Sequence, residues 1–500
     1  MTAPLLECQN YINGQWVAAQ SGETLESRNP SDWRDIVATF PRSSAADVDA
    51  AVAAARKAFT SWRLVPAPAR AELIYRIGEL LLQHKEKLAQ LISREMGKPL
   101  TEARGDVQEG IDCALYMAGE GRRMFGQTTP SEMPNKFAMT MRIPVGVCAL
   151  ITPWNFPVAI PCWKAFPALI CGNTVILKPA EDTPTCVHYL SQLFHKAGLP
   201  NGVFNVVHGL GEETGRALVE HSDVNLVSFT GSSETGAEVG SVCGRTHKRS
   251  CLEMGGKNAQ IVMADADLQL ALDGAIWGAF GTSGQRCTAT SRLILQRDIK
   301  EEFTHLLLER VHQLRLGLGT DPQTEVGPLI NSAQLQRVSH YLEIARAEGT
   351  KVLIGGEVVK TGNLEHGFFF QPTVLDKVTP EMRVAKEEIF GPVVALIEVD
   401  SFEDAIAILN NTPYGLSSSV YTRDINLAFQ AMRDIEAGIT YINGPTIGAE
   451  VHLPFGGVKQ TGNGHREVGT AALDVFTEWK TVYVDYSGSL QRAQIDNRAT

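Results

Sequence analysis

Cys287 and Glu253 are the two residues of this sequence whose types suggest chemistry most directly. Cys287 lies in the stretch GTSGQRCTATSR, and Glu253 lies upstream in LEMGGK. A cysteine thiolate attacks an electron-poor carbonyl carbon, and a nearby carboxylate activates the water that later releases the acyl group. A single cysteine in such a chain is more often a small buried hydrophobic residue. The hypothesis of a nucleophile with its base therefore depends on the motifs around the pair.

Five further motifs accompany this pair. They are TPWNFP around Asn155, ILKPAEDTP around Lys178 and Glu181, SFTGSSETG around Gly231, EEIFGPV around Glu388, and LPFGGVKQTG near the C-terminus. In residue type, order and approximate separation, the motifs resemble those of the aldehyde dehydrogenase superfamily. The resemblance runs from about Tyr11 to Tyr486. It implies an α/β chain of the aldehyde dehydrogenase fold that oxidises a small-molecule aldehyde to the carboxylic acid.

The resemblance makes Asn155 an oxyanion donor. Its side-chain NH₂, with the backbone N–H of Cys287, would stabilise negative charge on the former carbonyl oxygen; without the motif, a turn amide is the default interpretation. The inferred steps are thiolate attack, hydride transfer to a nicotinamide, and hydrolysis of the thioester by water that Glu253 deprotonates. Lys164 is similar to a family lysine near the proton-relay path, although a structural lysine would look identical.

The expected cofactor residues lie where two apolar runs end. TVILK ends at Lys178, and VNLVSFT ends just before Gly231. In a parallel sheet, ligands bind beyond the carboxyl ends of the strands, where helix N-termini offer free N–H groups. Ser232 could donate to a phosphate, although a helix cap would look the same. Gly209, Gly211 and Gly215 imitate the dinucleotide glycine pattern with the wrong spacing, and we interpret them as a turn.

The resemblance also assigns the two ribose sites. It places Lys178 and Glu181 at the adenine-side ribose, Glu388 and Phe390 at the nicotinamide ribose, and Trp154 among the cofactor residues. A carboxylate such as Glu181 accepts hydrogen bonds from ribose hydroxyls and repels a 2′-phosphate. NAD is therefore favoured over NADP.

Four residues are candidates for the substrate site. Phe156, Trp163 and Phe455 match family positions that line the aldehyde tunnel, although aromatic residues are more often simply core. Arg286, beside the nucleophile, could pair with a substrate carboxylate or equally with a structural acid. The stretch INGPTIGAEVHLPFGGVKQTGNGHREVG is similar to sequences of 2-oxoglutarate semialdehyde or aminoadipate semialdehyde dehydrogenases. These features suggest an ω-semialdehyde that carries a carboxylate.

The elements that must position these residues can be read from the apolar pattern. Val48, Val52, Ala55 and Phe59 recur at helical spacing, and the first hundred residues after Asn29 are expected to be largely helical, with a break at Pro66 and Pro68. Beyond Arg142, short apolar runs alternate with helical segments, which indicates a parallel sheet covered by helices. A second such series begins after about Gly256 and contains Cys287. Residues 137–142 and 476–486 alternate like strands.

These patterns and the resemblance predict the domain organisation. Residues 1–129 and 145–255 form a Rossmann-like NAD-binding domain, and 256–469 form an α/β catalytic domain. Residues 130–144 and 470–490 form a β-strand oligomerisation flap, which implies a homotetramer or dimer. The polar residues 491–500 are expected to be a disordered tail.

Composition excludes several other classes. A formal net charge of -11 and a pI near 5.6 disfavour nucleic acid as a partner. The longest apolar region, about residues 145–177, is interrupted by four prolines and Lys164, so no membrane span is expected. The sequence shows no secretory signal. Nine cysteines without a CxxC pair favour reduced thiols and a cytoplasmic protein, and the 12 histidines show no metal-ligand spacing.

Two other functions remain to be weighed. A CoA-dependent acylating enzyme would not need a deacylating carboxylate, and Glu253 argues against it. A binding or structural protein that kept the fold and lost catalysis is a different class. The joint presence of Cys287, Asn155, Glu253, Lys178 and Glu388 argues against that alternative.

Overall fold

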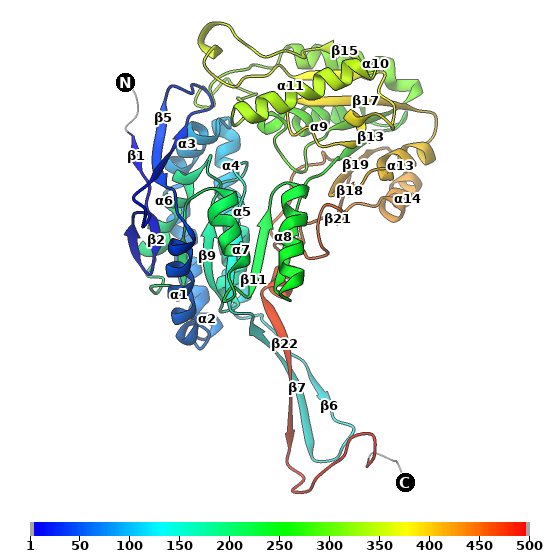
Figure 1. Ribbon diagram of the computed structural model, residues 1–500. Helices are drawn as coiled ribbons and strands as arrows, with labels where there is room; N and C mark the ends of the chain where they lie inside the picture. The colour runs from blue at the N-terminus through cyan, green and yellow to red at the C-terminus, as the bar shows by residue number, and fades with distance from the viewer. Residues whose placement is uncertain (1–4, 497–500) are drawn as a thin grey trace.

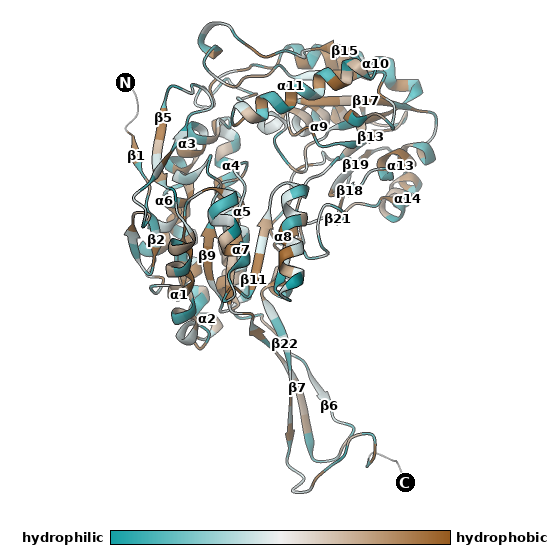
Figure 2. Cartoon of the chain, viewed as in Figure 1, coloured by the Kyte–Doolittle hydropathy of each residue, from teal (hydrophilic) through white to brown (hydrophobic). Residues whose placement is uncertain are grey.

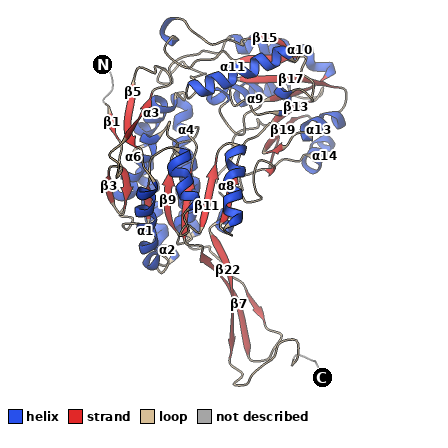
Figure 3. Ribbon diagram, viewed as in Figure 1, coloured by secondary structure: helices blue, strands red, loops and turns tan. Residues whose placement is uncertain are grey.

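The computed structural model describes residues 5–496 and contains two large sheets and a projecting arm (Figure 1). Residues 497–500 of the predicted tail 491–500 lie outside the described part of the chain. Helices cover both large sheets, as Figure 3 shows in blue over red. The chain thus has the predicted α/β architecture.

The first sheet has seven strands, in the order β12-β11-β8-β9-β10-β2-β3. Its parallel strands are β8 (Val147–Ile151), β9 (Thr174–Lys178), β10 (Phe204–Val206), β11 (Leu226–Thr230) and β12 (Arg249–Glu253). The edge is antiparallel and consists of β2 (Asn10–Ile12) and β3 (Gln15–Val17). The sequence analysis anticipated neither this edge nor β12.

Alternate residues of these strands enter two different cores. Cys148 and Leu150 point to one face of the sheet and enter the core that we call the first core. Val147 and Ala149 point to the opposite face and enter the second core. The first layer is built from α2 (Ala67–Gln83), α3 (Lys85–Met96), α4 (Leu100–Glu120), α5 (Ala159–Ile170) and α6 (Pro184–Lys196), and the second from α1 (Ala45–Trp62), α7 (Arg216–Glu220) and α8 (Ser233–Arg245). Burial on both faces explains the continuous apolar runs of β8 and β9. Strands β9 and β11 of this sheet are largely brown in Figure 2.

The second sheet also has seven strands, in the order β15-β16-β17-β14-β13-β19-β20. The strands are β13 (Ala259–Val262), β14 (Arg292–Gln296), β15 (Lys351–Ile354), β16 (Thr373–Asp376), β17 (Val393–Val399), β19 (Ser417–Tyr421) and β20 (Ile439–Ile442). All pairs are parallel except the edge pair of β15 and β16. Its two faces are covered by α9 (Leu268–Phe280) and α10 (Arg297–His312), and by α11 (Ser332–Ala347), α12 (Arg383–Lys386), α13 (Phe402–Asn410) and α14 (Ile425–Asp434).

The projecting arm is a three-stranded antiparallel sheet. β7 (Lys136–Pro144) pairs along its whole length with β22 (Thr477–Asp485), and β6 (Thr128–Pro130) adds a short edge. Strand structure in the two alternating segments is therefore confirmed. The large side chains Phe137, Trp479 and Tyr483 are exposed on this arm.

Smaller elements complete the chain. β1 (Leu6–Glu7), β4 (Thr24–Arg28) and β5 (Ile36–Pro41) form a small sheet, β18 (Tyr414–Gly415) pairs with β21 (Val458–Lys459), and α15 (Ala471–Val475) precedes the arm. The predicted helical break is confirmed, because α1 ends at Trp62 and α2 begins at Ala67 with Pro66 as its N-cap. Residues 455–468 return to the first sheet, where Gly462 bridges to Glu253 and Phe455 joins the first core. This return brings distant residues to one site.

Candidate active site

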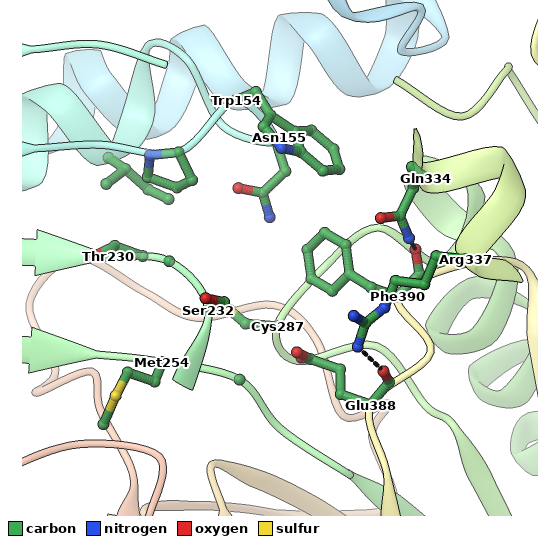
Figure 4. A pocket seen from close by; sticks show the side chains of 14 residues that line it. Trp154, Asn155, Thr230, Ser232, Met254, Cys287, Gln334, Arg337, Glu388 and Phe390 are labelled. Carbon is green, nitrogen blue, oxygen red and sulfur yellow. Dashed lines mark hydrogen bonds between the residues drawn. The ribbon is translucent and has the colours of Figure 1, made fainter. Parts of the chain in front are cut away.

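A cavity lies between the two large sheets and gathers seven of the predicted residues (Figure 4). From the first sheet come Trp154, Asn155, Gly231 and Ser232, and from the second half of the chain come Cys287, Glu388 and Phe390. Gln334 and Arg337 of α11 also line it and were not anticipated. In Figure 4 the Asn155 amide points into the space on the side of Cys287. We call this space the first cavity.

A second cavity adjoins the first. It contains the predicted residues Phe156, Trp163, Glu253, Arg286, Cys287 and Phe455. Cys287 lines both cavities, together with Ile160, Thr230 and Met254. A ligand bound covalently to the Cys287 sulfur can therefore be reached from two sides. One molecule can approach it from the first cavity and another from the second.

Cys287 follows a tightly wound segment. Thr282 and Ser283 have φ angles of 52° and 56° in the left-handed region, which is costly for non-glycine residues and is found preferentially at functional sites. The segment is held by Glu102, whose carboxylate accepts hydrogen bonds from the Thr282 backbone N–H at 3.0 Å and from its hydroxyl at 2.5 Å. Burial, Glu388 and Glu253 raise the pKa of Cys287 to about 12. At neutral pH the residue is a thiol and must lose its proton as it attacks.

Glu253 is the last residue of β12, and its carboxyl group is buried beside the second cavity. Among the described residues, no side chain donates a hydrogen bond to either carboxyl oxygen, and the backbone N–H of Gly457 is directed at the group. Gly456 leaves room for it, because a Cβ there would lie 2.6 Å from Glu253 Oε1. Burial and the neighbouring Glu467 raise the pKa of Glu253 well above its ordinary value. A carboxyl group with a raised pKa is well suited to accept a proton from water.

A buried ion pair lies behind Glu253. Lys164, on α5, contacts Glu467 and also donates to Ser228 Oγ at 2.9 Å. Lys164 does not line either cavity, whereas Glu467 lines the second. The sequence analysis missed Glu467, because 303 residues separate it from Lys164 and its own motif carries no obvious signal. The pair therefore places a carboxylate and an ammonium group next to Glu253.

Asn155 lies in the loop between β8 and α5. Its Nδ2 donates to the carbonyl of Gln285 at 3.0 Å, which leaves the second N–H for another acceptor. Asp106 holds the loop: its Oδ1 accepts from the Ala159 backbone N–H at 2.8 Å, and its Oδ2 pairs with Lys98 at 2.9 Å. The buried Lys98 ammonium lies 3.7 Å from the centre of the Phe156 ring. The amide is thus fastened at a defined position near Cys287.

Asn155→Ala is expected to lower kcat by about 10²- to 10³-fold, the usual effect of removing one oxyanion donor. The affinity for NAD should change little, because the side chain is bound to Gln285 and faces Cys287. Steady-state kinetics with a saturating aldehyde and a separate titration with NAD measure the two quantities. An unchanged kcat would remove Asn155 from this role.

The structure separates Lys178 and Glu181 from the first cavity. They form a 2.9 Å ion pair at the end of β9, beside the end of β8, and Glu181 remains half-exposed. A third cavity lies between α7 and α8 and is lined by Gly211 and Gly215. These glycines, interpreted above as a turn, form a short π-helix, Gly211–Gly215, that leads into α7. Two of the three glycines of the pattern therefore line the third cavity.

Several features of the first cavity fit a dinucleotide. Glu388 is half-exposed to the cavity, and its Oε1 accepts from the Gly256 backbone N–H at 2.9 Å. A Cβ at Gly255 would lie 2.5 Å from the same carboxylate, so a larger residue there would displace the Glu388 side chain. At the N-terminus of α8, Ser232 accepts from the Thr235 N–H, and Thr230 Oγ1 is buried without a partner in the described chain. A carboxylate for ribose hydroxyls and a helix N-terminus for phosphate suit this ligand.

Arg286 has a structural partner. Its Nη2 lies 2.6 Å from Glu102 Oε2, and its Nε donates to Thr282 Oγ1 at 2.9 Å. The guanidinium also lies 4.9 Å from the Trp277 ring and 5.4 Å from the Phe156 ring. Arg286 was expected to pair either with a structural acid or with a substrate carboxylate. The structural acid is present and is Glu102. Arg286 also lines the second cavity, so the pairing with a substrate carboxylate stays open.

Residues 5–496 contain neither a metal-holding cluster nor a membrane-spanning helix. No group of three or more histidine, cysteine, aspartate or glutamate residues there is placed to hold a metal ion. In the same residues, no helix is both long and apolar enough to cross a membrane.

The fold and the two joined cavities define an α/β enzyme with a cysteine between two binding spaces. A model of the aldehyde dehydrogenase family matches residues 16–482, so the chain belongs to the aldehyde dehydrogenase family and is an oxidoreductase that acts on an aldehyde.

Curated relatives and solved structures that are similar to this chain are also named aldehyde dehydrogenases. An alpha-ketoglutaric semialdehyde dehydrogenase of Bacillus subtilis (strain 168) is 44% identical over 475 residues, 95% of this chain and 97% of the relative. An alpha-ketoglutarate semialdehyde dehydrogenase of Haloferax volcanii is 42% identical over 96% of this chain and 99% of the relative. A betaine aldehyde dehydrogenase of Staphylococcus aureus in complex with NAD+ has a TM-score of 0.95 at 34% identity, over 97% and 96% of the two chains.

Proposed function

We propose that the protein oxidises a carboxylate-bearing semialdehyde to the acid with NAD, through a thioester on Cys287. The single observation that supports this most is that Cys287 lines both cavities, with Asn155 in the first and Glu253 in the second. A steady-state panel of acetaldehyde, benzaldehyde, succinate semialdehyde and 2-oxoglutarate semialdehyde tests it. Ranking by kcat/KM is required, because that ratio measures discrimination between substrates. A semialdehyde that carries a carboxylate should rank first.

Each residue has a defined part in this chemistry. Cys287 Sγ gives up its proton to water and attacks the aldehyde carbon, and Asn155 Nδ2 and the Cys287 backbone N–H stabilise the resulting oxyanion. NAD, when bound, supplies the hydride acceptor. Glu253 then takes a proton from water, which hydrolyses the thioester and regenerates the thiol. The Lys164–Glu467 pair offers the next proton acceptor behind Glu253.

The proposed cofactor site extends from the first cavity to the ion pair of Lys178 and Glu181 at the end of β9. Trp154, Glu388 and Phe390 would hold the nicotinamide half, Gly231 and Ser232 the phosphates, and Lys178 and Glu181 the adenine-side ribose. Glu181 supports NAD over NADP by repulsion of a 2′-phosphate. Values of kcat/KM for the two cofactors test this choice, and a wild-type preference for NADP would contradict it.

Two alternatives have decisive experiments. CoA-dependent acylation would yield an acyl-CoA, so product analysis with and without CoA separates it from hydrolysis. A catalytically inactive binding protein would give no NADH at 340 nm from any aldehyde. The buried Glu253, which lines the same cavity as Cys287, favours hydrolysis over both.

The substrate class is supported by Arg286 and by the names of the relatives. Both curated relatives described above act on alpha-ketoglutarate (alpha-ketoglutaric) semialdehyde by name. Within the described chain, hydrogen bonds engage Nε and Nη2 of Arg286, and none engages Nη1. The aromatic side chains of Phe156, Trp163 and Phe455 would enclose the aliphatic part of the substrate.

Arg286→Ala is therefore expected to lower kcat/KM for succinate semialdehyde by about 10- to 150-fold more than for butanal, since a hydrogen bond to a charged group contributes roughly 1.5–3 kcal/mol. Glu102→Gln is the matched control, because it removes the acid partner and keeps the arginine. That variant should retain the preference for the charged substrate. Equal losses for both aldehydes in Arg286→Ala would indicate a purely structural arginine.

Three further features belong to this proposal. The arm, with Phe137, Trp479 and Tyr483 exposed, would form the contacts of a homo-oligomer, and light scattering after size exclusion distinguishes dimer from tetramer. The domains would have the limits given in the sequence analysis. All nine cysteines are free in the structure, which supports a cytoplasmic location.

A further inference from the structure

Two charged residues, Arg286 and Glu109, line the second cavity, and three more, Glu102, Lys98 and Asp106, lie behind its wall. Two ion pairs lie here, Arg286 with Glu102 at 2.6 Å and Lys98 with Asp106 at 2.9 Å. Glu109, on α4 three residues after Asp106, also lines the cavity. No ion pair or hydrogen bond within residues 5–496 engages its carboxyl group. The cations Arg286 and Lys98 are each paired with one carboxylate, and Glu109 is a third carboxylate that has no cation of its own.

The surroundings of Glu109 favour its protonated form. Burial, Asp106 and Asp112 act against ionisation, while Arg286 and Lys98 oppose them. Together these effects raise the pKa of Glu109 to about 7. The other titratable groups around it are Cys113 on α4, Tyr441 on β20, and Glu253, Cys287 and Glu467 across the cavity.

We propose that Glu109 is a specificity-determining residue, which admits a substrate carboxylate to the Arg286 side of the cavity when it is protonated and excludes it when it is ionised. This inference rests on the proposed function, because it concerns aldehydes that carry a carboxylate. A protonated Glu109 leaves the five groups with no net charge and offers an O–H donor to the entering carboxylate. An ionised Glu109 places a like charge in a space with little water.

The direction of the pH effect follows. Below about pH 7 Glu109 is neutral, and the carboxylate is accepted. Above about pH 7 Glu109 loses its proton, and binding of the substrate carboxylate then requires that Glu109 take up a proton again. Since one proton is involved, kcat/KM for a charged aldehyde relative to a neutral one should fall by up to about tenfold per pH unit.

The experiment compares succinate semialdehyde with butanal, which has the same chain length, from pH 6 to 8.5. Ionisation of Cys287 and Glu253 affects both substrates, so the ratio of their kcat/KM values isolates groups that sense the carboxylate. We expect the wild-type ratio to fall above pH 7 and the ratio in Glu109→Gln to be independent of pH. Asp112→Asn is the matched control: this carboxylate lies three residues further along α4 and is exposed. The variant should keep the fall, with its midpoint moved to slightly lower pH, because the Asp112 charge helps to raise the pKa of Glu109.

The outcomes separate the two proposals. A flat ratio in the wild type, or a fall that persists in Glu109→Gln, overturns the role of Glu109 while both aldehydes still yield NADH. The role of Glu109 is also overturned if the kcat/KM ratio no longer falls above pH 7 in Asp112→Asn. Loss of any negative charge on α4 would then remove the pH dependence. If succinate semialdehyde yields no NADH at pH 6 while butanal does, the proposed substrate class itself fails.

Discussion

Cys287→Ala is expected to abolish NADH formation, with a loss on the order of 10⁴-fold or more, because no other group can form the covalent intermediate. Of the nine cysteines, Cys287 alone is not fully buried, and it alone lines both cavities. NAD affinity should be largely retained, since the proposed ribose and phosphate contacts come from other residues. Absorbance at 340 nm and a calorimetric titration with NAD measure the two quantities.

The control for this variant is Cys243→Ala. Cys243 is buried in α8, where this helix packs on the first sheet. It lines neither of the two joined cavities. Its replacement should leave turnover near the wild-type value. Activity of Cys287→Ala within tenfold of wild type would refute the mechanism.

Glu253→Gln is expected to separate the two half-reactions. Glutamine has nearly the same shape but cannot accept a proton, so hydrolysis of the thioester should slow by about 10²- to 10⁴-fold. A rapid burst approaching one NADH per active site should precede a slow steady state. Mass spectrometry should then find acylated Cys287.

The structure sharpens this test. The pKa of Cys287 is raised to about 12, so its thiol proton must leave during attack, and Glu253 lies beside the same cavity. If burst and steady state fall together without an acyl-enzyme, Glu253 is also the base that activates the thiol. If neither changes, Glu253 is structural, and CoA-dependent acylation becomes the better proposal.

Local sequence determined much of the fold. β8, β9 and β11 are buried on both faces, so their apolar runs were readable, and the alternation of β7 and β22 predicted strands in the arm. β12 was not readable, because its first two residues, Arg249 and Ser250, are polar and only half-buried. The strand that carries Glu253 could therefore be found only through its pairing with β11.

The sequence by itself also determined the family, since its motifs name Cys287, Glu253 and Asn155 directly. Only the tertiary structure decided which charges surround them. Glu467 reaches Lys164 across 303 residues, and Glu102 reaches Arg286 across 184. No local pattern encodes such pairs, because each depends on two chain segments that meet only after both sheets have formed. The raised pKa values of Cys287, Glu253 and Glu109 have the same origin: burial is a property of the assembled core, not of the neighbouring residues in the chain.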